Sequence, residues 1–363
     1  MIKIHHIPIL ILGRQISFLF LFMFLFSAGV SAEVVEKYKQ GMHVVMTGTG
    51  SAFPDPQRAG ASVAVIVDGT ILQFDFGRGV MENMMRADIN PLDVDYVFFT
   101  HHHFDHIASY DYFVISAWIG ARQKPVQVFG APGTQQMHDG AVNKMHASDY
   151  EFVQFITENW PPSLNLKPTK EPPFEVKDVM PGVIIDTEKF KVTAVSTPHY
   201  PTKNKLSLGY RVDSKYGSVV ISGDTGPSDA LTELAENADL LIHELVKPDP
   251  GMLKGGKFAS KDFQKDAKRD FNKSQSKRPQ TGHTSPSELG KLASAAKVKR
   301  LVAYHLAPYS SVDKAIEMVA LYTGPRPGPH IWAEMTHAVK KYYQGPFVLA
   351  EDGMIFTISN QEK

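Results

Sequence analysis

The segment from His101 to His106 combines imidazole and carboxylate groups at a spacing that can bind metal ions. It reads His-His-His-Phe-Asp-His and directly follows an apolar run. Alternate side chains of an extended backbone point the same way, so His101 and His103 can hold one ion. Asp105 and His106 come as the chain turns into a helix and can reach a second ion. His102 occupies the variable position of the pattern, and we expect it not to be a ligand.

Three further candidate ligands follow apolar runs later in the chain. His199, Asp224 and His305 each come directly after a segment that is typical of a buried strand. Folds of the α/β class place site residues at such strand ends. Taken singly, Asp224 also fits a turn cap, and either histidine fits an ordinary loop. Together the three complete the ligands of a two-metal site, with Asp224 as a carboxylate suited to bridging.

The composition restricts the chemistry of this site. The chain of 363 residues contains no cysteine, which excludes disulfides, thiolate nucleophiles and thiolate metal sites. Lys+Arg and Asp+Glu number 38 each, so no net charge attracts nucleic acid or anionic membranes. The length exceeds the usual size of one domain, yet layered α/β enzymes often fill it as a single unit.

The N-terminus predicts a secretory signal peptide. Basic residues precede an apolar run from Ile16 to Phe26, and small residues follow as far as Ala32. This run is shorter than the roughly 20 apolar residues that span a bilayer, which favours cleavage after Ala32 over a retained anchor. We therefore expect a leader at 1–32, a single hydrolase domain at 33–363, a periplasmic or secreted bacterial protein and no stable membrane anchor.

Short β-branched or aromatic runs predict two β-rich halves. The expected strands are 43–47, 62–67, 71–76 and 96–100 in the first half, and 192–195, 208–212, 218–222, 240–243 and 300–304 in the second. Helical periodicity is expected at 78–86, 107–118 and 285–295. This order predicts an α/β fold with two facing sheets between helices, a four-layer αββα sandwich. The proline-rich 160–181 reads as a surface connection, and the basic 253–280 reads as an insertion.

These residues resemble the metallo-β-lactamase superfamily and, within it, the ribonuclease Z-like and arylsulfatase-like branch. Supporting motifs are Gly48-Thr49-Gly50-Ser51, Phe74-Asp75-Phe76-Gly77, Ser222-Gly223-Asp224-Thr225 and Ile242-His243-Glu244. The resemblance implies a first ion held by His101, His103 and His199, a second held by Asp105, His106 and His305, and Asp224 as the bridge. Two Zn²⁺ ions are the expected cofactors, with Mn²⁺ or Fe²⁺ as alternatives.

The resemblance also implies catalytic roles. A hydroxide between the two cations is the expected nucleophile, because coordination lowers the pKa of water. His243, beside Glu244, is the candidate general acid for the leaving group, and its alternative role is to orient a ligand. Asp105 and Glu244 are further catalytic candidates. His283 is expected to contact the substrate or a metal-binding residue.

We interpret the chain as an exported hydrolase of a small sulfate or phosphate ester, arylsulfatase-like or phosphodiesterase-like. The alternative is a ribonuclease Z-like endoribonuclease that acts on tRNA 3′ ends. The leader, the Leu245-Val246 pair where that family has Ala-Thr, and the lack of a glycine- and lysine-rich arm before His199 favour the small anionic ester. Lactone or β-lactam hydrolysis and a non-catalytic metal-binding protein rank lower. Nucleic acid is kept as an alternative partner, and a homodimer as an option.

Overall fold

The computed structural model of the chain describes residues 36–161, 166–199, 206–249, 252, 282–309, 311–323 and 330–359. The leader predicted at 1–32 and the basic insertion predicted at 253–280 lie outside these residues, so both stay predictions. Among the helices that the structure describes, none combines the length and apolar character that crossing a membrane requires.

The first sheet has seven strands in the described part of the chain, ordered β14-β1-β2-β3-β4-β5-β6. They are β1 (Met42–Gly48), β2 (Ser62–Val67), β3 (Thr70–Phe74), β4 (Tyr96–Phe99), β5 (Val126–Gly130), β6 (Phe174–Asp178) and β14 (Ile355–Ile358). Strands β1, β2 and β3 pair antiparallel, and β3 to β6 pair parallel. The Asp68-Gly69 turn joins β2 to β3, with both residues at positive φ, as a tight hairpin requires.

The second sheet repeats this plan with seven strands among the described residues, ordered β13-β12-β11-β10-β9-β8-β7. They are β7 (Gly182–Asp186), β8 (Phe190–Thr197), β9 (Ser207–Ser214), β10 (Gly217–Ile221), β11 (Leu240–Glu244), β12 (Leu301–Tyr304) and β13 (Phe347–Leu349). Strands β7 to β10 pair antiparallel, and β10 to β13 pair parallel. Strands β8, β10, β11 and β12 therefore run in the same direction.

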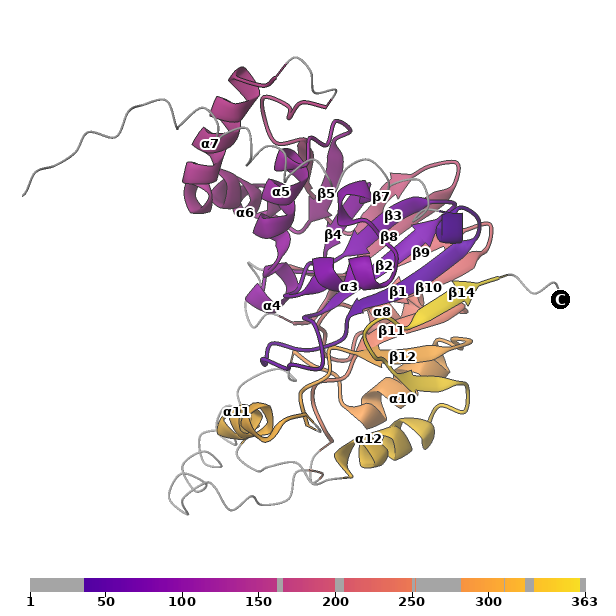
Figure 1. Cartoon of the computed structure of the whole chain (residues 1–363). Helices are drawn as coiled ribbons and strands as arrows, with labels where there is room; N and C mark the ends of the chain where they lie inside the picture. The colour runs from indigo at the N-terminus through magenta and orange to yellow at the C-terminus, as the bar shows by residue number, and fades with distance from the viewer. Residues whose placement is uncertain are drawn as a thin grey trace, which may run out of the picture.

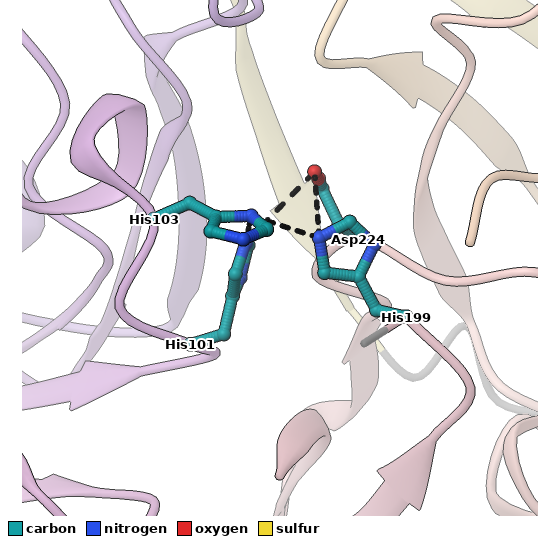
Figure 2. A group of neighbouring side chains, drawn as sticks. All are labelled: His101, His103, His199 and Asp224. Carbon is teal, nitrogen blue, oxygen red and sulfur yellow. Dashed lines mark hydrogen bonds and ion pairs between the residues drawn. The ribbon is translucent and has the colours of Figure 1, made fainter. Parts of the chain in front are cut away.

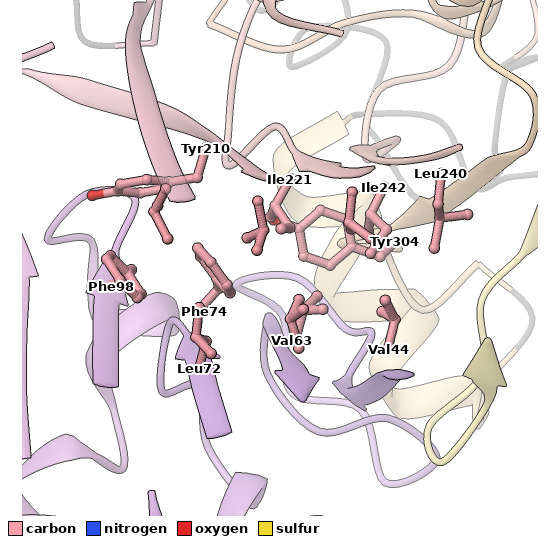
Figure 3. Packing of buried hydrophobic residues seen from close by; sticks show 14 of the residues in the cluster. Val44, Val63, Leu72, Phe74, Phe98, Tyr210, Ile221, Leu240, Ile242 and Tyr304 are labelled. Carbon is pink, nitrogen blue, oxygen red and sulfur yellow. The ribbon is translucent and has the colours of Figure 1, made fainter. Parts of the chain in front are cut away.

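The two sheets pack face to face over a shared apolar core. Figure 3 shows Phe74 and Phe98 of the first sheet against Tyr210, Ile221 and other side chains of the second. The rings of Phe74 and Phe98 stack with their centroids 5.0 Å apart, and Tyr210 crosses both at about the same distance. Burial of these rings supplies a large part of the free energy that holds the two halves together.

Helices cover the outer face of each sheet (Figure 1), which confirms the predicted four-layer αββα sandwich. The first half of the chain contributes α3 (Val80–Arg86), α4 (Phe104–Ile107), α5 (Tyr110–Ile119), α6 (Thr134–Gly140) and α7 (Ala147–Glu158), which alternate with strands β3 to β6. The second half contributes α8 (Asp229–Leu234), α10 (Pro286–Ala295), α11 (Asp313–Thr323) and α12 (Ile331–Lys340). Helix α10 begins with a capping box between Ser285 and Glu288, followed by Pro286 at the first helical position.

Each predicted strand and helix has a counterpart in the structure, but the interpretation of 160–181 as a plain connection was wrong. Strand β6 lies within it and pairs with β5 at the edge of the first sheet. Its sequence, FEVKD, is half polar and mostly not buried, because an edge strand has one open side. The α6 and α7 helices, which precede this segment in the chain, were also not predicted.

His146 fastens α7 to α5. Its Nε2 lies 3.0 Å from Asp111 Oδ2, and its Nδ1 lies 2.8 Å from Asp149 Oδ2. Ionised carboxylates only accept hydrogen bonds, so both ring nitrogens carry a hydrogen and the ring is charged. The hydrogen bond to Asp111, followed by that to Asp149, raises the pKa of His146. The ion pair thereby holds α7 on α5, the helix that comes shortly after the metal-binding segment.

We expect His146→Gln to lower the melting temperature at pH 5.5 by about 3 °C, the effect of one charge-assisted hydrogen bond in a chain of this size. Because folding raises the pKa, the stabilisation is complete below the unfolded pKa of about 6.5. It is lost as the pH rises through the folded pKa, so the effect of the variant shrinks by pH 9. Calorimetry at both pH values measures it, with the exposed His337→Gln as control. An effect of the same size at both would contradict the charged pair.

Candidate metal centre

The candidate ligands gather where strands of both sheets end. His101 comes two residues after the end of β4, His199 two after β8, Asp224 three after β10, and His305 directly after β12. Because β8, β10 and β12 run in the same direction, their carboxyl ends meet at one edge of the second sheet. The end of β4 faces this edge across the core, since the amide of Leu208 in β9 donates to the carbonyl of Thr100. The fold thus brings together residues some 200 positions apart in sequence.

Unusual backbone conformations place several of these side chains. His305 and Asp75 have φ of 57°, a left-handed conformation that is rare for residues other than glycine. Gly223, just before Asp224, has φ of 58°, and a Cβ atom there would lie 2.6 Å from Thr100 Cβ. Only glycine fits this position, and it lets the turn after β10 approach the end of β4.

The first group of candidate ligands consists of His101, His103, His199 and Asp224, whose side chains converge in Figure 2. His103 Nδ1 lies 2.9 Å from His101 Nε2 and 2.9 Å from His199 Nε2. Asp224 Oδ2 lies 4.0 Å from His101 Nε2 and 3.8 Å from His199 Nε2. Three imidazole nitrogens and one carboxylate oxygen therefore face a common point, the donor set of a zinc site.

The second group consists of Asp105, His106 and His305. His305 Nε2 lies 3.1 Å from Asp105 Oδ2, and His106 Nε2 lies 3.6 Å from the same oxygen. The other oxygen of Asp224, Oδ1, lies 3.3 Å from His106 Nε2 and 3.2 Å from His305 Nε2. The two oxygens of one carboxylate thus face two groups, as the predicted bridging role of Asp224 requires.

Buried polar atoms without a hydrogen bond indicate that these residues fit metal ions. His106 Nε2 and Asp224 Oδ1 are buried and lie 3.3 Å apart, yet neither makes a well-aligned hydrogen bond within the described residues. Such atoms cost free energy unless they are paired or bound to a cation. At His199 the Nδ1 atom donates to the Gly282 carbonyl at 2.7 Å, so Nε2 presents its lone pair to the first group. Nitrogen and oxygen donors of this kind suit zinc, iron or manganese.

Asp75 supports two of the histidines from behind. Its Oδ2 accepts hydrogen bonds from His106 Nδ1 and the Thr100 hydroxyl, both at 2.8 Å, and its Oδ1 accepts one from the Thr100 amide. The same hydroxyl lies 3.0 Å from His101 Nδ1. A proton fixed on Nδ1 of His106 leaves Nε2 as the ligand atom. Asp75 belongs to the Phe74-Asp75-Phe76-Gly77 motif that carries part of the family resemblance, but the sequence alone assigned it no role.

Burial and neighbouring charges shift the pKa values of the histidines in opposite directions. Burial, together with the nearby His106, lowers the pKa of His101 well below its usual value. Burial also disfavours the charged form of His106, but Asp224, Asp75 and Asp105 outweigh it and raise the pKa of that ring. A proton on His106 therefore competes with a cation for the same carboxylates, and cation binding releases it.

Glu244 and His283 form an ion pair beside the first group. Glu244 Oε1 accepts hydrogen bonds from His283 Nδ1 at 3.2 Å and from the Thr284 amide at 2.9 Å. His283 Nδ1 also lies 4.0 Å from Asp224 Oδ2. Burial lowers the pKa of His283, but Glu244 and Asp224 raise it to about 9. The side chain of His283 is 32% exposed and that of Glu244 is inaccessible, so His283 is the member that can meet a substrate.

His243, the predicted general acid, has different surroundings. Its ring is fully buried, its Nδ1 donates to the Glu244 carbonyl at 2.8 Å, and burial lowers its pKa. Side chains alternate along a strand, so His243 shares the face of Leu241, which packs under the outer helices. Ile242 and Glu244 share the opposite face. The proton-donor role of His243 stays a prediction, and the geometry favours His283 for it.

His102 lies outside both ligand groups, in line with its place at the variable position. Its Nε2 lies 2.8 Å from the Thr134 hydroxyl at the start of α6. Asp178 accepts hydrogen bonds from the amides of Gly133 and Gln135 at the same helix start. The contact between His102 and Thr134 ties the metal-binding segment to α6, and nothing in the spacing of the sequence indicated it.

Comparisons with known proteins agree with this site. The metallo-beta-lactamase superfamily model matches residues 56–270. Ribonuclease Z of Mycobacterium marinum is 32% identical over 213 residues, 57% of this chain and 72% of that protein. Ribonuclease Z of Mycobacterium sp. (strain KMS) is 34% identical over 57% of this chain and 70% of that protein.

Solved structures support the fold. Human tRNase Z, short form, superposes with a TM-score of 0.56 at 21% identity, over 87% of this chain and 99% of that chain. The metallo-beta-lactamase fold protein YhfI from Bacillus subtilis superposes with a TM-score of 0.58 at 18% identity, also over 87% and 99%. At these identities the likeness concerns the fold and not the substrate.

The chain therefore belongs to the metallo-β-lactamase superfamily, as its motifs predicted. Within that superfamily it resembles ribonuclease Z, and it is a metal-dependent hydrolase that acts on ester bonds. Members generally bind divalent metal ions, and the two groups of histidines and aspartates provide for them. The assignment of zinc in particular stays a prediction.

We expect Asp75→Asn to weaken zinc binding by about 10- to 100-fold, the usual effect of losing a carboxylate that supports a metal-binding histidine. The amide nitrogen would face donors at Thr100 or His106 and disturb the ring orientation. Titration against a chromogenic chelator measures the affinity. The control is Asp239→Asn, since Asp239 accepts hydrogen bonds from Ser218 and Lys299 at the opposite end of the sheet. Equal zinc affinity in both variants would contradict the supporting role.

Proposed function

We propose that the chain hydrolyses phosphodiester bonds, and that RNA is the first substrate class to test. The observation that carries this proposal is the position of Asp224. Its Oδ1 lies within 3.3 Å of nitrogens of the second group, and its Oδ2 faces the histidines of the first. Two cations held by these groups would supply charge stabilisation for in-line displacement at phosphorus and would activate a water. The two ligand groups and their shared carboxylate fit that chemistry.

The Glu244–His283 pair supports a substrate with a poor leaving group. Glu244 Oε1 holds the proton on His283 Nδ1, so the Nε2 proton is the one that can be transferred. The alcohol released from a nucleotide or alkyl phosphodiester needs such a proton, because an alkoxide is a poor leaving group. A nitrophenolate released from an aryl sulfate leaves readily without one. A charged His283 therefore favours phosphodiesters over aryl sulfates.

The relatives named ribonuclease Z support the RNA alternative more than the exported small-ester enzyme favoured by the sequence analysis. One observation still favours a small phosphodiester. The part of the chain at 134–158, which forms α6 and α7, has four acidic residues and one lysine. Figure 1 shows these helices at the end of the molecule beyond β5. RNA binding relies on Lys and Arg contacts to phosphates, which this surface does not offer.

A turnover panel on purified, zinc- or manganese-loaded protein tests the proposal. The panel contains precursor tRNA with a 3′ trailer, bis(p-nitrophenyl) phosphate, p-nitrophenyl sulfate and a lactone. We expect the two phosphodiesters to be cleaved, and Asp224→Ala to reduce both rates at least 100-fold together with metal content, more than a supporting residue contributes. Preference for the sulfate would contradict the proposal. Cleavage of the small diester alone would identify the small-phosphodiester enzyme.

The pH profile tests the proton donor. His283 donates only while it is protonated, so kcat should fall above about pH 9, the pKa set by burial, Glu244 and Asp224. Glu244→Gln removes the charge that raises this pKa, so the fall in kcat should begin at lower pH. His243→Asn should leave the pH of this fall unchanged. A fall that shifts in the His243 variant and not in the Glu244 variant would restore His243 as the donor.

We also propose that the protein is exported and that it forms a dimer. The sequence before residue 33 is typical of a cleaved leader, and the branch resembled by the chain often forms dimers. N-terminal sequencing of protein released by osmotic shock from a bacterial host tests export. Light scattering at micromolar concentration tests dimerisation. A mature protein that keeps residues 1–32 inside the cell would contradict export.

A further inference from the structure

Phe104 lies between ligands of the two metal groups. His103, which precedes it, belongs to the first group, and Asp105, which follows it, belongs to the second. Consecutive Cα atoms are about 3.8 Å apart, so the backbone of Phe104 borders both groups directly. Phe104 is therefore the chain neighbour of one candidate ligand in each group.

The ring of Phe104 faces solvent. The residue is 67% exposed, whereas Phe76 and Phe113 nearby are buried and stack at 4.6 Å between ring centroids. Phe104 takes part in none of the ring contacts found among the described residues. His102, at the other variable position of the segment, is by contrast held by the Thr134 hydroxyl. The core of the fold therefore does not explain an aromatic side chain at position 104.

The backbone that carries this ring is fixed. The amide of His106 donates to the His103 carbonyl at 3.0 Å, and the amide of Phe76 donates to the His106 carbonyl at 2.7 Å. Asp105 is buried on one side of Phe104, and the glycine at 77 packs its Cα against the Asp105 carbonyl. A ring with two side-chain torsions on a fixed backbone loses little conformational entropy when a ligand stacks on it.

We propose that Phe104 is a stacking surface for a planar aromatic group attached to the scissile phosphate, and so sets substrate selectivity. The inference rests on the proposed phosphodiesterase function for the identity of the ester. A flat π face beside the reacting group binds a nucleobase or an aryl ring without hydrogen-bond readout. A saturated ring of equal size offers less face-to-face contact and no quadrupole match. Stacking of one base on an aromatic side chain changes binding by about tenfold.

Calorimetry on metal-loaded protein tests this with phenyl phosphate and cyclohexyl phosphate, which share charge and size and differ in planarity. We expect the wild type to bind phenyl phosphate about tenfold more tightly. Phe104→Ala and Phe104→Leu should remove this preference by weakening phenyl phosphate alone, and Phe104→Tyr should keep it. Adenosine and uridine monophosphates against ribose 5-phosphate form the nucleobase arm. Preference in one arm only identifies which planar group the surface accepts.

Phe152→Ala is the matched control, because Phe152 is 52% exposed on α7 and lies far along the chain from the ligands. Unchanged metal content in each variant shows that the site is intact. No aromatic preference in the wild type, or equal weakening of both ligands by Phe104→Ala, would overturn the inference. Calorimetry needs no turnover, so aromatic selectivity without phosphodiester cleavage would contradict the proposed function alone.

Discussion

The buried carboxylate of Asp75 is the constraint on which the metal centre depends. It lies just past the end of β3 and accepts hydrogen bonds from the Thr100 amide and hydroxyl and from the His106 ring. These bonds join the end of β3 to the end of β4 and fix the tautomer of His106 in one step. An unpaired charge here would be costly, so the local chain must fold around it. Asp75 itself adopts a left-handed backbone to do this.

The sheet topology explains why ligands so distant in sequence meet at this constraint. Each half of the chain builds antiparallel strands first and parallel strands next to them, and the facing apolar sides pack together. The carboxyl ends of several strands then open onto one edge, where short loops hold polar side chains without breaking the ladder of hydrogen bonds. Asp224 belongs to the second half and lies against His101 and His106 of the first. The packing of the two sheets therefore also brings the ligands of the site together.

The sequence predicted most of the central strands and the ligand groups because both depend on local signals, but it missed β5 (Val126–Gly130), which lies between β4 and β6. Apolar runs of β-branched and aromatic residues fixed β1 to β4 and β8 to β12, and a polar residue after each run pointed to a site. Edge strands such as β6 and β13 have one open side and a mixed composition, so periodicity did not find them. The partner of Glu244 depended on which face of β11 each side chain occupies. The family resemblance favoured His243 as the proton donor, whereas the alternation of the strand places its ring on the face opposite to Glu244.

The charge balance of the site couples metal binding to folding. The site buries four carboxylates, and each lies beside a histidine of the site: Asp75, Asp105, Asp224 and Glu244. Protonated His106 and His283 offset part of this charge, as their raised pKa values indicate. Cations at the two ligand groups replace protons in that role and interact with the folded chain far more than with the unfolded one, in which the ligands are scattered. By mass action they therefore stabilise the fold and, in particular, the left-handed backbone of His305 after β12.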